Sequence, residues 1–292
     1  MSDIRAVLKA LRPHQWLKNL LVLVPLLAAH RLDQRSILIA ATAFGSFSLF
    51  ASGGYVLNDL FDVTSDKLHS RKRNRPFASG ALTIGPGILL LSVTWTVGFG
   101  LAALFLPISF GVVITIYLIG TIAYSIRLKR EPVLDVLVLA GLYVVRVVAG
   151  GVAGAISIST WLLAFTLFVS LSLAFLKRFI EVREYKGQGF AEVPGRGYRA
   201  DDAVWLHSVG LSSAYLAAVV LAIYANSADV VRLYSRPERL LFICPLLLYW
   251  ATRAWLRAHR GEMHDDPVVA VALDPTTYVI AAISVAVVVS AV

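Results

Sequence analysis

Long apolar stretches recur along the whole chain, and they constrain its fold more than any other feature of the sequence. A helix that crosses a bilayer needs roughly 20 consecutive, mostly apolar residues. The sequence lacks the roughly 10-residue alternating segments of a membrane β-barrel, so we expect helices. It predicts an all-α, polytopic membrane protein, a single domain over residues 1–292, with nine transmembrane helices at 17–32, 36–57, 84–106, 108–126, 133–155, 159–177, 204–225, 239–256 and 273–291.

The composition excludes several other classes of protein. Hydrophobic residues make up 58% of the chain and charged residues only 15%, whereas soluble domains contain about 45–50% and about 25%. Such a chain is neither disordered nor a basic nucleic-acid-binding domain, and we expect no nucleic acid partner. The one cysteine, Cys244, lies in an apolar run, so a disulfide scaffold is also excluded.

The positive charges are distributed unevenly between the predicted loops. If the N-terminus is cytoplasmic, 21 of the 27 lysines and arginines lie on the cytoplasmic side. Because cytoplasmic loops of membrane proteins are enriched in these residues, we expect a plasma-membrane protein with its N-terminus inside and its C-terminus outside. The long loops at 58–83, 178–203 and 257–272 then lie on the cytoplasmic side, which we expect to carry the function.

Four side chains with oxygen donors follow the second predicted span at helical spacing. Asn58, Asp62 and Asp66 lie four residues apart on one stripe of a helix, and Asp59 falls on the same side. We call these four residues the acidic ladder. Such carboxylates repel one another unless a cation lies between them, and Mg²⁺ prefers oxygen ligands. The acidic ladder therefore predicts a Mg²⁺ site, with a solvated helix end as the alternative.

A dense basic run from Lys67 to Arg75 follows the acidic ladder. Mg²⁺ alone does not neutralise a diphosphate, and arginine forks or lysine charges commonly supply the remaining positive charge. Arg71 and Arg75 are therefore candidate phosphate contacts. A positive anchor at the membrane surface is the alternative interpretation of this run.

The spacing Asn-Asp-x-x-Asp-x-x-x-Asp, followed by Arg-Pro at 75–76, resembles the UbiA superfamily of intramembrane prenyltransferases, as do the nine spans. The resemblance covers the whole chain. It implies a ring of helices around a central cavity, with Mg²⁺ and a diphosphate at the cytoplasmic mouth. By matching position it implies that Asn58, Asp62 and Asp66 face the metal and that Asp59, Asp62 and Asp66 are catalytic.

The chain departs from one pattern of this superfamily. Members that prenylate aromatic acceptors carry a second acidic motif, Asp-x-x-x-Asp, just after the sixth span. In the corresponding stretch, residues 175–184, Lys177 and Arg178 replace the first acids. These cations cannot ligate a metal but are suited to phosphate. Glu181 and Glu184 follow, and they could pair with the bases or contact a metal.

This substitution resembles the branch of decaprenyl-phosphate phosphoribosyltransferases. Residues 12–19, 124–135 and 146–151 are similar to that branch as well. The resemblance implies transfer of a 5-phosphoribosyl group from phosphoribosyl pyrophosphate to a polyprenyl phosphate such as decaprenyl phosphate. The substrate contacts that it implies are Lys18, Arg71, Arg75, Lys129, Arg130, Asp135, Arg146, Lys177, Arg178 and Glu181.

Two alternative functions fit parts of the pattern. An aromatic prenyltransferase would move a polyprenyl chain from its diphosphate to a hydroxybenzoate or quinone precursor, but the second acidic motif is missing. A transporter would often carry broken helices in paired halves with polar groups at the membrane midplane, whereas these acids cluster at one helix end. The sequence leaves the polyprenyl length and the oligomeric state open.

Overall fold

The structure is a computed structural model that describes residues 4–68, 72–263 and 266–292. The described residues form helices and connecting loops, with one isolated β-bridge between Glu192 and Arg199. Residue packing divides the chain into two compact units. Unit 1 comprises residues 1–129 and 145–158, and unit 2 comprises residues 130–144 and 159–292. The single domain expected from the sequence stays a prediction.

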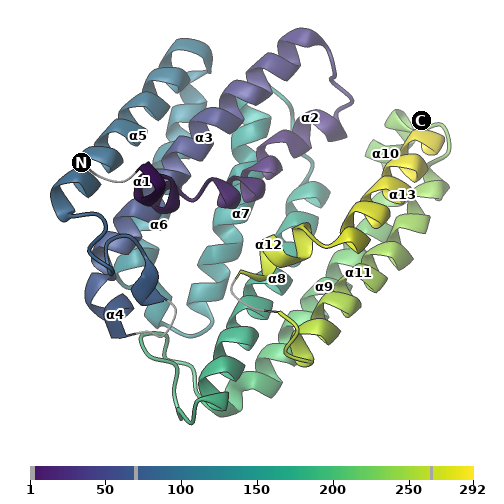
Figure 1. Cartoon of the computed structure of the whole chain (residues 1–292). Coiled ribbons are helices and arrows are strands. Elements are labelled where there is room, and N and C mark those ends of the chain that lie inside the picture. Colours follow the sequence, from purple (N-terminus) through teal and green to yellow (C-terminus); the bar gives the residue numbers. More distant parts are fainter. Residues whose placement is uncertain (1–3, 69–71, 264–265) are drawn as a thin grey trace. The chain divides into compact units, whose positions relative to one another are not determined.

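Unit 1 is organised around α3 (Gln34–Phe61), which packs most extensively against α5 (Ile84–Phe105) and also contacts α6 (Ile108–Ile126) (Figure 1). Asp33 begins α3 by accepting a hydrogen bond from the Ser36 N–H at 3.0 Å. The shorter elements of this unit are α1 (Ile4–Leu11), the 3₁₀ helix η1 (Pro13–Leu23), α2 (Val24–Ala28), α4 (Val63–Leu68) and η2 (Lys72–Asn74).

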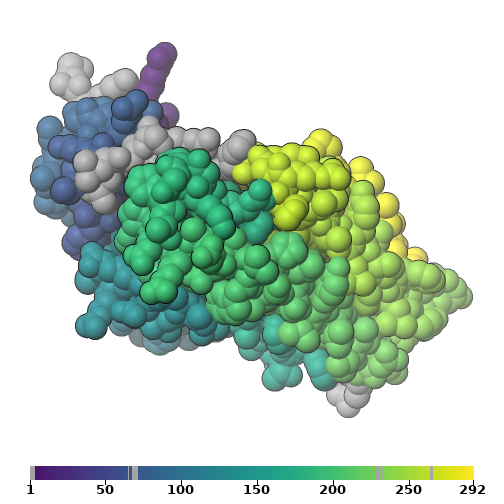
Figure 2. All heavy atoms as spheres, turned by 90° about the horizontal axis from the view of Figure 1, so that it is seen from below, coloured from purple at the N-terminus to yellow at the C-terminus, as the bar shows by residue number. Residues whose placement is uncertain are grey.

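Unit 2 is organised around α8 (Thr160–Gly187) and α9 (Ala203–Ala225), which form its most extensive helix pair. Helix α11 (Ile243–His259) contacts both, and α13 (Pro275–Ala291) packs against α11; Figure 2 shows these last two in yellow-green and yellow. The shorter elements are η4 (Ala200–Asp202), α10 (Ala228–Leu233), η5 (Pro237–Phe242) and α12 (Pro267–Ala272).

Two elements are divided between the units. Helix α7 (Leu134–Ala153) contributes residues 134–144 to unit 2 and residues 145–153 to unit 1. The 3₁₀ helix η3 (Leu128–Arg130) ends with Arg130 in unit 2.

Seven of the nine predicted spans are confirmed as helical segments long and apolar enough to cross a membrane, at 34–61, 84–105, 108–126, 134–153, 160–187, 200–225 and 237–259. The other two are shorter. The predicted span at 17–32 is replaced by η1 and α2, and the one at 273–291 is α13, with 17 residues. The described residues therefore give a multi-pass chain without confirming the count of nine.

Helices α3 and α8 are longer than a bilayer crossing requires. Each has 28 residues, which at 1.5 Å per residue is about 42 Å, against a hydrocarbon core about 30 Å thick. The charged residues lie near the helix ends: Arg35 and Asp59 in α3, and those between Lys177 and Lys186 in α8. The excess length therefore carries charged side chains beyond the apolar part of each helix.

Gly150 allows α7 to approach η1 closely within unit 1. A Cβ atom at this position would lie 1.9 Å from the carbonyl oxygen of Val22, so the backbone would have to move. We expect Gly150→Ala to lower the free energy of unfolding by about 1–3 kcal/mol, measured by thermal unfolding in detergent. Gly141→Ala on the same helix is the matched control, because a Cβ there meets nothing within 4 Å. Equal destabilisation by both substitutions would contradict this packing role.

The membrane orientation predicted from the charges can be tested with single cysteines. Gln188, Ser235 and Arg260 are exposed. Along the chain, Gln188 precedes α9, Ser235 lies between α9 and α11, and Arg260 follows α11. In a Cys244→Ala background, we expect cysteines at 188 and 260 to react only with reagents that reach the cytoplasm. A cysteine at 235 should react only from outside. Labelling of 188 and 235 from the same side would show that the predicted topology is wrong.

Candidate active site

The acidic ladder (Asn58, Asp59, Asp62 and Asp66) lies in unit 1, where α3 is followed by α4. Helix α3 ends at Phe61, and the Asp62 N–H donates to the Asn58 carbonyl at 3.0 Å. The Asn58 side-chain amide also donates to Asp62 Oδ2 at 3.0 Å. Asp59 and Asp66 are buried, with 1% and 3% of their surface exposed. The helix stripe predicted over residues 58–66 is thus interrupted at Asp62, and the four oxygen donors lie around the junction of α3 and α4.

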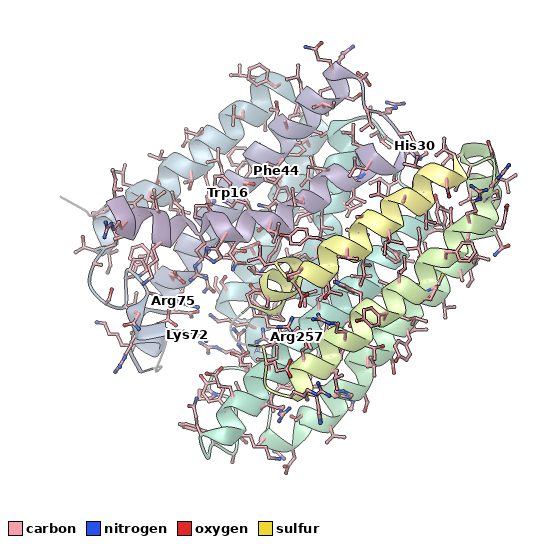
Figure 3. All side chains as sticks on the ribbon, turned by 45° about the vertical axis from the view of Figure 1, so that its right-hand side comes forward. Trp16, His30, Phe44, Lys72, Arg75 and Arg257 are labelled. Atoms are coloured by element: carbon pink, nitrogen blue, oxygen red, sulfur yellow. The ribbon has the colours of Figure 1, made fainter. Side chains whose placement is uncertain are left out.

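Two arginines distant in sequence contact the buried carboxylates of the acidic ladder. Arg12 donates from one nitrogen to both oxygens of Asp59, at 2.6 and 2.7 Å. Arg75 donates from one nitrogen to Asp59 Oδ1 at 3.1 Å and to Asp66 Oδ2 at 2.7 Å. Figure 3 shows Arg75 near Lys72 in unit 1. Asp59 and Asp66 therefore converge on a single guanidinium nitrogen.

The contact of Arg12 with the acidic ladder was missed by the sequence reasoning. Arg12 lies between α1 and η1, with a left-handed backbone (φ 50°) that is uncommon for a residue other than glycine. Such conformations cost energy and concentrate at functional sites. Its presence in the Arg-Pro motif at residues 12–13 was the available signal, but that motif does not identify the partner.

Other predicted phosphate contacts differ in their positions. Lys129 Nζ donates to Asp62 Oδ1 at 2.6 Å, so this lysine joins the acidic ladder within unit 1. Arg130 is exposed and belongs to unit 2. Arg71 lies outside the described residues. The structure therefore brings Arg75 and Lys129 to the acidic ladder.

Burial and the Arg75 partner shift the pKa of the Asp66 carboxyl in opposite directions. Burial raises this pKa, and the charge and hydrogen bond of Arg75 oppose the rise in part. Taking a carboxylate out of water disfavours its charged form, so a cation nearby stabilises the ionised side chain. The local electrostatics of Asp66 therefore favour binding of positive charge.

The donor set of the acidic ladder fits Mg²⁺ by its chemistry. Among the residues that the structure describes, no three Asp, Glu, His or Cys side chains form a group that could hold a metal ion. The ladder carboxylates bond Arg12, Arg75 and Lys129. However, these carboxylates and the Asn58 side-chain carbonyl are the kind of oxygen ligands that Mg²⁺ prefers. Asp59 and Asp66 already share one cationic nitrogen of Arg75. The residues present therefore suit a hard cation.

Arg146 is buried in the part of α7 that belongs to unit 1. Its Nε donates to Asn19 Oδ1 at 2.9 Å and a terminal nitrogen donates to the Tyr117 hydroxyl at 3.2 Å. Its guanidinium also lies over the rings of Tyr117 and Phe47, at 5.1 and 5.2 Å. Lys18, next to Asn19, is buried too. The sequence indicated Arg146 and Lys18 but gave no signal for Tyr117 or Phe47, which come from α6 and α3.

Asp135 and Arg178 form a buried ion pair in unit 2. Arg178 Nε donates to Asp135 Oδ2 at 2.5 Å, and the two side chains are 1% and 0% exposed. Arg178 also pairs with Glu181 on the same helix. Lys177 is half-buried beside it in the chain. The sequence identified these four residues but missed Tyr198, whose hydroxyl donates to Asp135 Oδ1 at 2.7 Å from 63 positions away.

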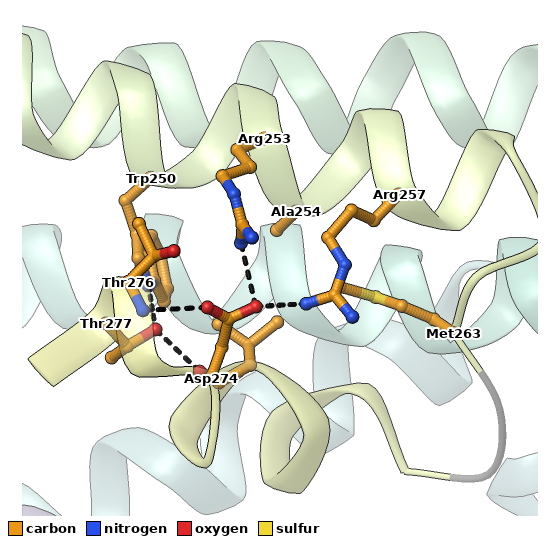
Figure 4. Close-up of a pocket in the computed structure, with 9 residues that line it drawn as sticks. Trp250, Arg253, Ala254, Arg257, Met263, Asp274, Thr276 and Thr277 are labelled. Carbon is orange, nitrogen blue, oxygen red and sulfur yellow. Dashed lines mark hydrogen bonds and ion pairs between the residues drawn. The ribbon is translucent and has the colours of Figure 1, made fainter.

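A small pocket in unit 2 contains a second arginine cluster, between α11 and the turn from α12 to α13 (Figure 4). Asp274 accepts hydrogen bonds from Arg253 at 2.7 Å and from Arg257. Asp274 also accepts from the Thr276 N–H at 2.8 Å and thereby begins α13. The Trp250 indole donates to Thr277 at 3.0 Å. These contacts attach α13 to α11.

Asp274 gives a pH-dependent contribution to stability. The hydrogen bond from Arg253 is the main cause that lowers its pKa from 3.8 to about 2. Because the folded pKa is below the unfolded one, the contribution is present above about pH 4 and is lost as the pH falls toward 2. We expect Asp274→Asn to lower the free energy of unfolding at pH 7 by about 1.5–3 kcal/mol. Thermal unfolding from pH 7 to pH 2 measures this.

The control for this prediction is Asp201→Asn, because the Asp201 side chain is 96% exposed and its ion pair with Lys186 is also solvent-exposed. An unchanged unfolding temperature of Asp274→Asn at pH 7 would contradict the proposed attachment of α13.

Comparison with known proteins gives several relatives. Residues 20–273 match the UbiA prenyltransferase family. The chain is 37% identical over 279 residues to the uncharacterized protein y4nM of Sinorhizobium fredii, covering 94% of this chain and 54% of that one. It is 34% identical over 258 residues to nodulation protein NoeC of Azorhizobium caulinodans, covering 88% and 84%. The decaprenyl-phosphate phosphoribosyltransferase of Mycobacterium tuberculosis is 38% identical over 199 residues, 64% of each chain.

The chain thus spans about half the length of y4nM and less than two thirds of the phosphoribosyltransferase. Among solved structures, a UbiA homolog from Archaeoglobus fulgidus bound to GPP and Mg²⁺ aligns with a TM-score of 0.72 and 16% identity, covering 97% of this chain and 99% of the other. At this identity the likeness shows the fold alone. The family match extends over most of the residues, and the helical fold agrees with it: the chain belongs to the UbiA prenyltransferase family.

Proposed function

We propose that this protein transfers a 5-phosphoribosyl group from phosphoribosyl pyrophosphate to a polyprenyl phosphate at the cytoplasmic face of the plasma membrane. The observation that carries the proposal is the cation pair Lys177 and Arg178, which replaces the second acidic motif of aromatic prenyltransferases. Relatives named decaprenyl-phosphate phosphoribosyltransferase support it. The family is a transferase family, so a transporter is not proposed.

In this proposal the acidic ladder binds the diphosphate end of the donor. Asn58, Asp62 and Asp66 would hold Mg²⁺, which when bound neutralises charge on the departing pyrophosphate. Arg75 and Lys129, which already contact ladder carboxylates, would donate to the diphosphate oxygens. Asp59 orients the guanidinium of Arg75 by accepting its hydrogen bond.

The reaction needs little proton transfer. A phosphate oxygen of the lipid attacks the anomeric carbon of the donor, a new carbon–oxygen bond forms, and pyrophosphate leaves with the electrons of the old bond. The attacking oxygen is already anionic, so no general base is required. Catalysis then depends on positioning and on stabilising the leaving group. Lys177 and Arg130 are proposed contacts of the 5-phosphate, and the buried Lys18 and Arg146 are proposed contacts of substrate phosphate.

Prenyl transfer is the second candidate, because the solved UbiA homologs include chains bound to GPP or DMAPP with Mg²⁺. One assay separates the two reactions. The purified protein is incubated with labelled phosphoribosyl pyrophosphate and polyprenyl phosphate, and separately with labelled prenyl diphosphate and hydroxybenzoate. A labelled phosphoribosyl lipid supports the proposal. Formation of prenylated hydroxybenzoate alone would contradict it.

A further inference from the structure

The loop between α8 and η4 in unit 2 places one buried tyrosine against the start of α7. The loop folds back on itself, because the Val193 N–H donates to the Tyr198 carbonyl and the Ala200 N–H donates to the Ala191 carbonyl, both at 2.8 Å. Gly197 has a φ of +68°, and a Cβ there would lie 2.7 Å from the Arg130 carbonyl oxygen. This close approach delivers Tyr198, which is 1% exposed, into the interior of unit 2.

The Tyr198 hydroxyl makes two hydrogen bonds in that interior. It accepts from the Val133 N–H at 2.8 Å and donates to Asp135 Oδ1 at 2.7 Å. Val133 has a φ of +68°, and the Leu134 N–H donates to the Pro132 carbonyl at 2.8 Å across it. Such a three-residue turn is strained, above all at a β-branched residue. Tyr198 therefore stabilises an unfavourable turn and also fixes the carboxylate that follows it.

The contacts continue from Asp135 to residues that solvent can reach. Asp135 uses its other oxygen to bind Arg178, and Arg178 also binds Glu181. Arg196 from the same loop lies 3.7 Å from Glu181. The side chains of Asp135 and Arg178 are at most 1% exposed, whereas those of Glu181 and Arg196 are each 17% exposed. A ligand can therefore reach the outer end of this chain of contacts but not its buried end.

Charge indicates what kind of ligand fits the outer end. The two carboxylates and two guanidiniums of this chain of contacts balance, and the neighbouring half-buried Lys177 adds one positive charge. An anion is therefore attracted, and a guanidinium binds the oxygens of a phosphate group with two parallel hydrogen bonds. Arg178 is too deeply buried to make this contact itself, whereas Arg196 is accessible.

We propose that Tyr198 is a positioning residue for a phosphate site whose accessible contact is Arg196. It acts through Asp135, which orients Arg178 and thereby the Glu181–Arg196 pair. The ligand is a phosphomonoester, and its identity as the 5-phosphate of the donor rests on the proposed function. Burial and the hydrogen bond to Asp135 raise the pKa of the Tyr198 hydroxyl, so it keeps its proton and donates throughout the physiological range.

The test compares Tyr198→Phe with Tyr234→Phe in the full chain in nanodiscs. Tyr234 is also buried in unit 2, but it packs in a different cluster, with Ala225 and Val230. Binding of ribose 5-phosphate is measured by calorimetry, and KM and kcat are measured for both substrates. We expect Tyr198→Phe to weaken ribose 5-phosphate binding and raise the donor KM roughly 10-fold or more, because Asp135 loses a charge-assisted hydrogen bond and no longer fixes Arg178 and the Glu181–Arg196 pair. The lipid KM and kcat should change less than about twofold.

Arg196→Gln tests the accessible end, where folding is least affected. It should weaken ribose 5-phosphate binding by a similar factor, and Arg196→Lys should restore part of it. Unchanged binding in Arg196→Gln, or equal effects of the two Tyr→Phe variants, would overturn the proposal. If the wild type binds ribose 5-phosphate but does not transfer phosphoribosyl groups, the proposed function fails while the positioning role is still measurable. If the wild type transfers phosphoribosyl groups but the donor KM is unchanged in Tyr198→Phe and in Arg196→Gln, the positioning role is wrong and the proposed function is unaffected.

Discussion

Asp66→Asn is expected to lower kcat/KM by about 100-fold or more, which corresponds to about 3 kcal/mol of transition-state stabilisation. Asp66 is buried and bonds Arg75, so its carboxylate lies where the proposed leaving group and its cation would gather. An amide of the same size keeps the packing but removes the negative charge. Asp62→Asn should have an effect of similar size, because Asp62 bonds both Asn58 and Lys129. Initial rates with phosphoribosyl pyrophosphate and polyprenyl phosphate measure both.

Metal removal provides the independent check on this prediction. EDTA should abolish turnover by the unmodified protein, and added Mg²⁺ should restore it. Asp201→Asn, at a nearly fully exposed position, controls for the substitution itself and should leave the rates unchanged. Full activity in EDTA would show that the metal prediction for the acidic ladder is wrong, whatever the effect of the substitutions.

Arg178→Met is expected to lower the free energy of unfolding by about 3–5 kcal/mol, because it leaves the buried carboxylate of Asp135 without its cationic partner. The double variant Asp135→Asn, Arg178→Met should recover much of this loss, since it no longer buries an uncompensated charge. Chemical unfolding in detergent measures the cycle. Additive losses in the double variant would show that the two side chains do not depend on one another.

Lys177→Ala, at the position next to Arg178, is the control for this double-mutant cycle. Lys177 is half-buried and its removal leaves the Asp135–Arg178 pair in place, so it should lower the free energy of unfolding much less than Arg178→Met does. If it contacts donor phosphate, the donor KM should rise by roughly 10- to 150-fold, the value of a charge-assisted hydrogen bond. A large loss of stability with an unchanged donor KM would exclude this role for Lys177.

The sequence was sufficient for features that depend on local pattern. Apolar runs of about 20 residues predicted seven long helices to within a few residues at most ends, since the bilayer imposes their length. The C-terminal end of α8 is the exception, extending to Gly187 where the sequence suggested residue 177. The spacing of the acidic ladder predicted one continuous helix, whereas α3 ends at Phe61 and α4 begins at Val63, with Asp62 between them.

What the sequence could not supply are partners distant along the chain. Arg12 binds a carboxylate 47 positions away, and the Arg146 guanidinium is fixed by Asn19, 127 positions away. Such pairs depend on how whole helices pack, and no periodicity encodes them. The role of Tyr198 could not be predicted for the same reason. The sequence of a polar loop does not show whether its tyrosine is exposed or is buried by the fold of the loop.

The 3₁₀ helix η1 changes how far the beginning of this chain can reach. A 3₁₀ helix rises about 2.0 Å per residue, and runs longer than three or four residues are uncommon. The 11 residues of η1 therefore extend about 22 Å, and the five of α2 add about 7.5 Å. The combined length of these 16 residues is therefore close to the thickness of a hydrocarbon core, about 30 Å. The same residues in an α-helix would be only about 24 Å long.

The same winding aligns side chains at intervals of three. Trp16, Asn19 and Val22 fall on one row, and each meets a partner in unit 1: Trp16 donates to Ser52, Asn19 binds Ser48 and Arg146, and Val22 lies against Gly150. Tolerance to substitution in this segment should therefore vary with a period of three. Deleting one residue would turn the row by about a third of a revolution and shorten the segment by about 2 Å, so insertions and deletions here should be far less tolerated than conservative substitutions.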